Sequence, residues 1–136
     1  MRTIDANVIL RFLTNDLPDQ ANQAASLLKK VENKQEQVFL PDIILADIIW
    51  ILEGYYKQSR EQVRDWIIAI LSLPGLEFPS KKVAFNALDI YVENRIDWSD
   101  AFTAGQMIAQ GITEIISFDK HFDSIKGIIR IEPKCV

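Results

Sequence analysis

The sequence predicts an α/β fold, arranged as a three-layer α/β/α sandwich around a mainly parallel central sheet. Short apolar runs alternate along the chain with longer segments in which apolar residues recur at helical spacing. Parallel strands are buried on both faces, so they appear as continuous apolar runs of this kind. The chain has 136 residues, of which 49% are hydrophobic, and contains no repeat or linker. We therefore expect one domain spanning residues 1–136.

The expected elements follow from this alternation. The short apolar runs predict strands at residues 2–5, 38–40, 76–78, 114–117 and 127–131. The segments with helical spacing predict helices at residues 6–13, 19–31, 42–56, 59–71, 81–95 and 97–110. Ser59 and Gln62 match a capping box at the start of the fourth helix, and Gly111 is a good stop for the last one.

Composition limits the classes of function. The net charge is −4, from 19 acidic and 15 basic residues, which argues mildly against a nucleic-acid partner. Setting aside Asp5, Asp47, Asp100 and Asp119 leaves 15 acidic against 15 basic residues, so charge does not decide the question. The single cysteine, Cys135, excludes an internal disulfide and favours a reducing compartment.

No membrane segment is expected. The N-terminal apolar runs are interrupted by polar residues, so no signal peptide is predicted. The longest apolar stretch, residues 43–52, contains Asp47 and is too short to cross a bilayer. We expect a soluble, cytoplasmic protein.

The four aspartates set aside above occupy unusual positions. Asp5 and Asp119 each follow a predicted strand, and sites in open α/β sheets form where strands end. Asp47 interrupts a helix that is apolar nearly all round, where an unpaired buried carboxylate is costly. Asp100 lies at the start of a helix. The joint pattern favours a carboxylate cluster, which is stable mainly when cations bind it.

Each aspartate also has a structural explanation that stays open. Asp5 and Asp119 suit tight turns, and the side chain of Asp47 could reach solvent at the helix edge. Asp100 could belong to a capping arrangement with Asp97, although Asp97 alone fits that role.

Carboxylates of this kind suit hard divalent cations. Mg²⁺ is typically held by a few carboxylates together with substrate phosphate, and two such ions can clamp a phosphodiester. An ion that activates water removes the need for a side-chain nucleophile, which fits a chain with one histidine and a terminal cysteine. We expect the histidine, His121, to be a surface loop residue. The chain has no His/Cys cluster for zinc and no glycine-rich phosphate loop.

Four segments together resemble the PIN-domain ribonucleases, most closely the VapC-type toxins of bacterial toxin–antitoxin pairs. They are Ile4-Asp5-Ala6-Asn7-Val8-Ile9-Leu10-Arg11, Leu45-Ala46-Asp47-Ile48-Ile49-Trp50-Ile51-Leu52, Asp97-Trp98-Ser99-Asp100-Ala101 and Ser117-Phe118-Asp119-Lys120-His121-Phe122. The resemblance implies an acidic pocket at the strand ends and Mg²⁺- or Mn²⁺-dependent endonucleolytic cleavage of RNA by metal-activated water. It also implies a homodimer and a small antitoxin that inhibits the toxin.

The resemblance also implies roles for individual residues. The catalytic carboxylates would be Asp5, Asp47, Asp100 and Asp119, with Asp5, Asp100 and Asp119 as the metal ligands. Asn7 and Ser117 would hydrogen-bond the carboxylates or a metal-bound water, and Asp97 matches a position that is often acidic. Asp47 departs from the family, which usually has glutamate there. Aspartate is shorter by one methylene, roughly one 1.5 Å bond.

Two other classes of function stay open. A PIN-like module that is catalytically weak or inactive and binds RNA or a protein is motivated by Asp47. A phosphotransferase with Asp5 as covalent nucleophile is disfavoured, because such enzymes commonly place a second aspartate where this chain has Asn7.

Two surface features complete the expectations. Arg11 and Lys120 are candidates to contact phosphate. The helices that contain Trp50, Tyr55, Tyr56 and Trp66 are expected to form a symmetric dimer interface.

Overall fold

The structure, a computed structural model, describes all 136 residues. They form two compact units, Met1–Lys81 and Lys82–Val136, which we call the N-terminal and C-terminal units. The chain contains six α-helices and five strands, and every strand pairing is parallel. The predicted α/β class with parallel strands is therefore confirmed. That both units make one domain over residues 1–136 stays a prediction.

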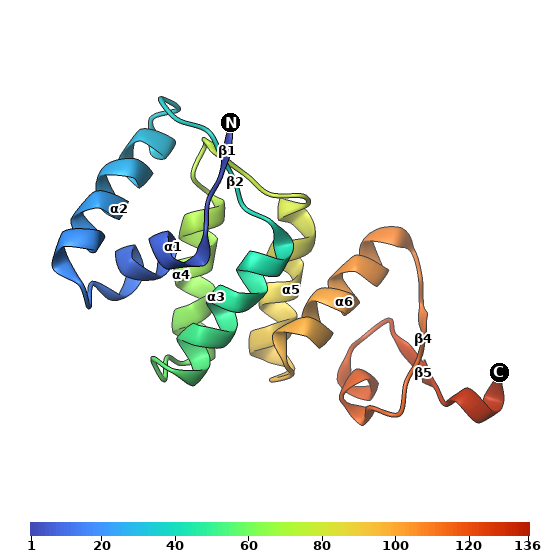
Figure 1. Ribbon diagram of the computed structural model, residues 1–136. Helices are drawn as coiled ribbons and strands as arrows, with labels where there is room; N and C mark the ends of the chain where they lie inside the picture. The colour runs from blue at the N-terminus through green and yellow to red at the C-terminus, as the bar shows by residue number, and fades with distance from the viewer. The chain divides into compact units, whose positions relative to one another are not determined.

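The N-terminal unit is built on a three-stranded sheet of order β1-β2-β3 (Figure 1). The strands are β1 (Arg2–Thr3), β2 (Val38–Phe39) and β3 (Leu76–Glu77). The first strand was expected to be buried, but Arg2 and Thr3 are exposed and only the following Ile4 is buried. The reason is that β1 pairs with β2 alone in this sheet, so the two strand residues lie at its edge.

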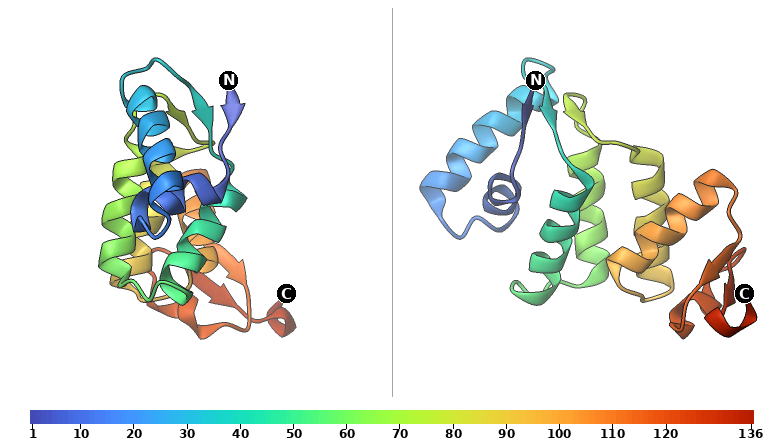
Figure 2. Two further views of the ribbon diagram at one scale, coloured as in Figure 1. Left: turned by 60° about the vertical axis from the view of Figure 1, so that its left-hand side comes forward. Right: turned by 45° about the vertical axis from the view of Figure 1, so that its right-hand side comes forward.

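Four helices complete this unit. They are α1 (Ala6–Thr14), α2 (Pro18–Glu32), α3 (Asp42–Gly54) and α4 (Arg60–Leu71). In Figures 1 and 2, α1 packs against α2, and α3 lies beside α4. The side chain of Ser59 accepts a hydrogen bond from the backbone N–H of Gln62, which confirms the predicted cap. Fully buried aliphatic residues fill the space between helices and sheet: Ile9, Val31, Leu40, Leu45, Ile48, Ile49, Leu52, Val63, Ile67, Leu71 and Leu76.

Gly75 lets the chain enter β3 next to the end of α2. A Cβ atom at this position would lie 2.3 Å from the carbonyl oxygen of Glu36 and 2.6 Å from that of Val31. The backbone N–H of Gly75 donates to the same Val31 carbonyl at 2.9 Å. Only glycine fits this approach without moving backbone.

The C-terminal unit contains two helices and a two-stranded parallel sheet. Its helices are α5, which begins at the unit boundary (Lys81–Glu93), and α6 (Trp98–Gln110). Its strands are β4 (Glu114–Ile116) and β5 (Ile129–Ile131). Gly105 of α6 lies close to α5, since a Cβ there would be 3.1 Å from the carbonyl oxygen of Val83. Figure 1 shows α6 next to α5.

Two 3₁₀ helices in this unit were not predicted, η1 (Lys120–Ser124) and η2 (Pro133–Cys135). Their shortness leaves too few residues for a periodic pattern. Gly111 ends α6 in the left-handed conformation, with φ of 71°, as predicted. None of the helices is both long and apolar enough to cross a membrane.

Candidate functional site

A cluster of two carboxylates and an imidazole lies in the C-terminal unit. Asp100, Asp119 and His121 each offer a ligand atom, and these atoms lie within 4.8 Å of one another. Nδ1 of His121 is 3.1 Å from Oδ1 of Asp119 and 3.9 Å from Oδ2 of Asp100. Carboxylate oxygens and imidazole nitrogen are the donors that divalent metal ions take in proteins. This donor set therefore fits a divalent cation.

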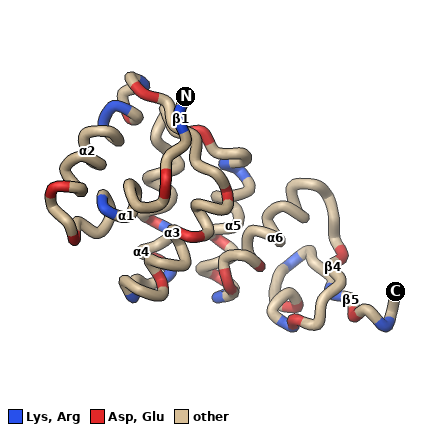
Figure 3. The backbone as a smooth tube through the Cα atoms, in the orientation of Figure 1, with Lys and Arg blue, Asp and Glu red and all other residues tan.

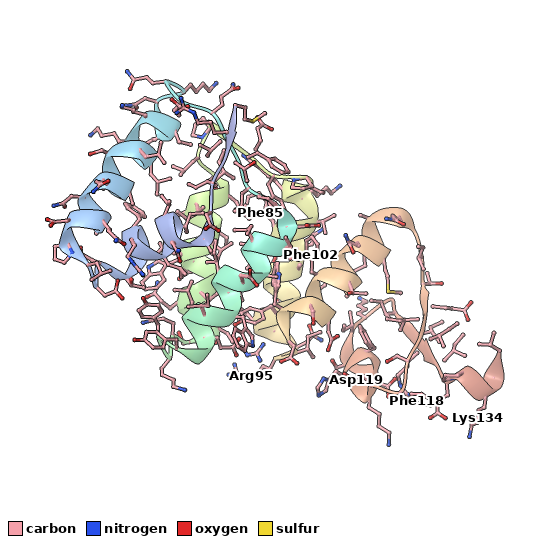
Figure 4. The ribbon with its side chains drawn as sticks, viewed as in Figure 1. Phe85, Arg95, Phe102, Phe118, Asp119 and Lys134 are labelled. Carbon is pink, nitrogen blue, oxygen red and sulfur yellow. The ribbon has the colours of Figure 1, made fainter.

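Asp119 is held by the turn that follows β4, where Figure 4 labels it. Its backbone N–H donates to Oγ of Ser117 at 2.9 Å. Its own Oδ1 accepts from the backbone N–H of His121 at 2.9 Å, so it caps η1. Asp119 therefore does form the turn, as the structural explanation of this residue expected. Its Oδ2 takes no part in the cap. The hydroxyl oxygen of Ser117 accepts from the backbone of Asp119, and its expected hydrogen bond to a carboxylate or a metal-bound water stays a prediction.

Asp100 lies in the first turn of α6, with its side chain 24% exposed. Partial burial raises its pKa, and the negative charges of Asp119 and Asp97 raise the pKa further, while His121 opposes the shift. The three acidic groups therefore repel one another, which a bound cation would relieve.

Asp97 occupies the N-cap position of α6, yet its side chain makes no capping hydrogen bond. The predicted N-cap position of Asp97 is confirmed, but its side chain does not cap the helix. Only its backbone carbonyl takes part, accepting from the N–H of Ala101 at 2.9 Å. Its carboxylate contributes negative charge near Asp100 instead.

The other predicted carboxylates lie in the N-terminal unit. Asp5 is exposed at the start of α1, where its Oδ1 accepts from the N–H of Ala6 at 2.8 Å. Asn7 is in the first turn of α1 and lines a cleft of about 430 Å³ between α1 and α2, together with Arg11, Gln20 and Gln23. Asp5 thus has a structural role as a cap and remains accessible.

Asp47 is exposed, which contradicts its predicted burial. It shares a face of α3 with Ile43 and Trp50, at spacings of four and three residues, and their side chains are 69% and 78% exposed. The helix is apolar nearly all round, but it buries only the face that carries Leu45, Ile48, Ile49 and Leu52. The sequence left open that the side chain of Asp47 reaches solvent at the edge of the helix, and this is what the structure shows.

The predicted residues therefore fall into two groups. Asp5, Asn7 and Asp47 belong to the N-terminal unit, in which α1 contacts α3. Asp97, Asp100, Ser117 and Asp119 belong to the C-terminal unit, where Asp100 and Asp119 come together with His121. That the two groups form one site stays a prediction.

His121 was expected to be a surface loop residue, and its contact with the predicted carboxylates was not foreseen. Its side chain is 59% exposed, but its imidazole lies against two of the predicted carboxylates. The available signal was its position two residues after Asp119, since an aspartate that caps a short turn bonds the N–H two residues later.

Basic residues in the C-terminal unit lie mainly around η1 and β5 (Figure 3). Arg130 is engaged by Asp123 and Glu132, whereas Lys120 and Lys126 are exposed and form no ion pair. In the N-terminal unit, Arg11 donates to Gln20 at 3.0 Å and lies 3.6 Å from Asp16. The lysines are therefore freer than Arg11 to contact a phosphate.

Comparison with known proteins identifies the class to which this fold and site belong. A sequence model of the PIN domain matches residues 3–128, so the chain belongs to the PIN-domain family. The chain is also similar to a VapC ribonuclease of Aquifex aeolicus (strain VF5), with 23% identity over 133 residues that cover 98% of this chain and 97% of the relative. The resemblance found in the sequence is confirmed, and six helices with parallel strands are consistent with the α/β/α fold of the family.

Proposed function

We propose that this protein is a metal-dependent endoribonuclease that hydrolyses phosphodiester bonds of RNA. The observation that carries the proposal is the cluster of Asp100, Asp119 and His121 in a chain that belongs to the PIN-domain family. The similarity to a relative named as a VapC ribonuclease supports RNA as the substrate.

The carboxylates that the PIN-family resemblance implies would supply the proposed site. Asp5, Asp100 and Asp119 would hold Mg²⁺ or Mn²⁺, and Asp47 would complete the set of catalytic carboxylates. A divalent ion bound by these residues would supply Lewis acidity toward the phosphate and lower the pKa of a water molecule. Partial burial, followed by the charges of Asp119 and Asp97, raises the pKa of Asp100, and a cation bound beside Asp100 would favour its charged form.

Residues around the carboxylates would position the ligands and the RNA. Ser117 fixes the backbone of Asp119 through the 2.9 Å hydrogen bond described above. Asn7 lies two residues after Asp5, on the first turn of the helix that Asp5 caps, and would orient that side of the site. Lys120 and Lys126 carry free positive charges near Asp119 along the chain, and would contact the phosphate backbone.

We further propose that the protein acts as the toxin of a type II toxin–antitoxin pair and forms a homodimer. The name of the relative supports the first part. The second part rests on Trp50 and Tyr55, whose side chains are 78% and 76% exposed at the end of α3 and just after it. Tyr56 and Trp66 are only partly exposed and would contribute less. Sedimentation at micromolar concentration tests the dimer, and a monomer would contradict it.

A second candidate is a PIN-like module that binds RNA or a protein without cleaving it. Asp47 motivates this alternative, since it replaces a glutamate usual in the family and forms no hydrogen bond or ion pair in its exposed position. In that case the protein would bind RNA whether or not metal is present.

The deciding experiment is cleavage of a mixed structured-RNA pool by purified protein, with Mn²⁺ or with chelator. The Asp5→Asn variant is purified in parallel, and Asp65→Asn serves as the matched control, because Asp65 is an exposed carboxylate on α4 outside the proposed site. We expect cleavage that needs metal and Asp5 and is unchanged in Asp65→Asn. Cleavage by wild type no faster than by Asp5→Asn would favour the binding module.

A further inference from the structure

His121 lies against both carboxylates of the C-terminal cluster, although it is the only histidine in the chain. Its Nδ1 is 3.1 Å from Oδ1 of Asp119 and 3.9 Å from Oδ2 of Asp100. The metal ligands named above are carboxylates alone, and neither nitrogen of this imidazole has been given a role.

The position of His121 is built into the fold by a chain of hydrogen bonds. Its backbone N–H donates to Asp119, and its backbone carbonyl accepts from Oγ of Ser124 at 2.9 Å. The amide of Asn94, just after α5, donates in turn to the backbone carbonyl of Ser124 at 2.8 Å. Phe122, the next residue of η1, is only 4% exposed and anchors the turn in the core. These hydrogen bonds and the buried Phe122 therefore hold in place the backbone to which the imidazole is attached.

The spacing of donor atoms suits shared coordination of one ion. Two ligand atoms at right angles about an ion, each at the 2.0–2.1 Å typical of octahedral Mg²⁺ sites, lie roughly 3 Å apart. The 3.1 Å between Nδ1 of His121 and Oδ1 of Asp119 agrees with such a pair. The Asp100 oxygen lies 3.9 Å from the same nitrogen, and the ligand atoms of all three residues lie within 4.8 Å of one another.

We propose that His121 is a protein ligand of the metal ion that Asp100 and Asp119 hold, and that it biases the site toward first-row transition ions over Mg²⁺. This inference rests on the metal site of the proposed function and deepens it. Imidazole suits first-row transition metals, whose affinity for a given site rises from Mn²⁺ to Co²⁺ and beyond, whereas Mg²⁺ prefers oxygen ligands. A site made of carboxylates alone would lack this bias.

The test measures metal coordination directly on the full chain, freed of any polyhistidine tag. Electron spin echo spectroscopy of the Mn²⁺-loaded protein detects coupling to the ¹⁴N of a coordinated imidazole. Because the chain has one histidine, any imidazole coupling belongs to His121. Calorimetric titrations with Co²⁺ and with Mg²⁺ measure the preference.

We expect nitrogen coupling in the wild type and none in His121→Ala. That substitution should weaken Co²⁺ binding by about ten-fold or more and leave Mg²⁺ binding within about three-fold. Lys120→Ala, in the same 3₁₀ helix, is the matched control and should keep the nitrogen coupling. Thermal unfolding in chelator checks that each variant is folded, which the 59% exposed side chain of His121 should permit.

The outcomes separate this inference from the function on which it rests. Wild type without nitrogen coupling, or His121→Ala with unchanged Co²⁺ affinity, would overturn the role of His121. If Asp119→Asn abolishes Mn²⁺ binding in the same series, the carboxylate metal site stands without the histidine. If Asp119→Asn binds Mn²⁺ as the wild type does, the metal site itself is wrong.

Discussion

The backbone N–H of Asp119 donates a 2.9 Å hydrogen bond to the hydroxyl oxygen of Ser117. Both residues lie after the end of β4, where no strand partner fixes Asp119. This bond therefore sets the direction in which the Asp119 carboxylate leaves the chain. The main-chain carbonyl of Ser117 accepts from Arg130 at 3.2 Å, which ties the same turn to β5.

Replacing Ser117 with alanine should weaken metal binding. A neutral hydrogen bond contributes about 0.5–1.5 kcal/mol, and its loss would let Asp119 move away from the orientation that binds the ion. We expect Ser117→Ala to weaken Mn²⁺ affinity by about three- to ten-fold in a calorimetric titration. Ser117→Thr retains the hydroxyl and is the control. Equal affinities for wild type and alanine variant would show that the turn holds Asp119 without this bond.

Replacing Asp100 with asparagine should stabilise the metal-free protein at neutral pH. Burial and two neighbouring carboxylates raise the pKa of Asp100 above 3.8, so the folded state disfavours its charge. The charged Asp100 side chain therefore destabilises the wild type above the raised pKa. The effect vanishes at low pH, where Asp100 is protonated in both the folded and the unfolded protein. In chelator, Asp100→Asn should therefore unfold at a higher temperature than the wild type at pH 7, with the gap closing below pH 3.8.

Saturating Mn²⁺ provides the internal control for Asp100. The ion should raise the melting temperature of the wild type and do so much less for Asp100→Asn, because the variant lacks the ligand. An asparagine variant that melts below the wild type at pH 7 in chelator would mean that the carboxylate contributes a favourable contact instead.

The hydrogen bond between Tyr56 and Asp16 should make stability depend on pH in the opposite direction to Asp100. The phenol of Tyr56 donates to Oδ2 of Asp16 at 2.6 Å, and this bond is the main cause of the lowered pKa of Asp16. The bond stabilises the folded protein fully above 3.8, the pKa of Asp16 in the unfolded chain. This stabilisation is lost as pH falls through the lower pKa that Asp16 has in the folded protein. Tyr56→Phe should thus melt below the wild type at pH 7, with the difference shrinking below pH 3.8.

Tyr55→Phe is the matched control for this prediction. The neighbouring ring is 76% exposed and its hydroxyl forms no hydrogen bond. Removing that hydroxyl should leave the melting temperature unchanged at every pH. A pH-independent loss in Tyr56→Phe would assign its effect to packing and not to the carboxylate.

The regular elements were predictable because they follow local rules. All six helices and five strands appear close to their expected positions, since amphipathic spacing and caps such as Ser59 act within a few residues. The short 3₁₀ helix at Lys120–Ser124 was not predicted, because it depends on hydrogen bonds to Ser117 and Asn94. Asn94 lies thirty residues from the Ser124 that it holds, and no local pattern encodes such a contact.

The sequence predicted two members of the cluster in the C-terminal unit, whereas a site that also includes Asp5 and Asp47 stays a prediction. Asp100 and Asp119 come together as expected, and the family likeness supplied their pairing. The burial of Asp47 was wrong, because a helix with apolar residues all round does not reveal which face the fold covers. The position of the His121 imidazole against these carboxylates was not predicted, because it depends on the direction of a turn, which the residue type alone does not reveal.

Substitutions at Asp47 should separate activity from stability. Because Asp47 is exposed and unpaired, Asp47→Asn should change the unfolding free energy by no more than about 0.5 kcal/mol. As a proposed catalytic carboxylate, the same substitution should lower metal-dependent RNA cleavage about ten-fold or more, while Asp47→Glu retains or raises it. Cleavage by Asp47→Asn at the wild-type rate would remove this residue from the site.

Two glycines in the N-terminal unit should respond oppositely to the same substitution. A Cβ at Gly75 would lie within 2.6 Å of two backbone carbonyl oxygens, which cannot move without displacing the connection to β3. Gly75→Ala should therefore destabilise by about 1–3 kcal/mol. At Gly54, the last residue of α3, a Cβ meets nothing within 4 Å. Gly54→Ala should stabilise by about 0.4–1 kcal/mol, since alanine restricts the unfolded chain.

Urea unfolding of both glycine variants checks this contrast, because the added methyl group is the same in each. The sign should differ between them while the dependence of free energy on urea stays unchanged. If both variants lose stability by similar amounts, the loss of Gly75→Ala would reflect a general cost of the methyl group. If Gly75→Ala is neutral, the backbone of Val31 and Glu36 must move more easily than the hydrogen bond from Gly75 to the Val31 carbonyl suggests.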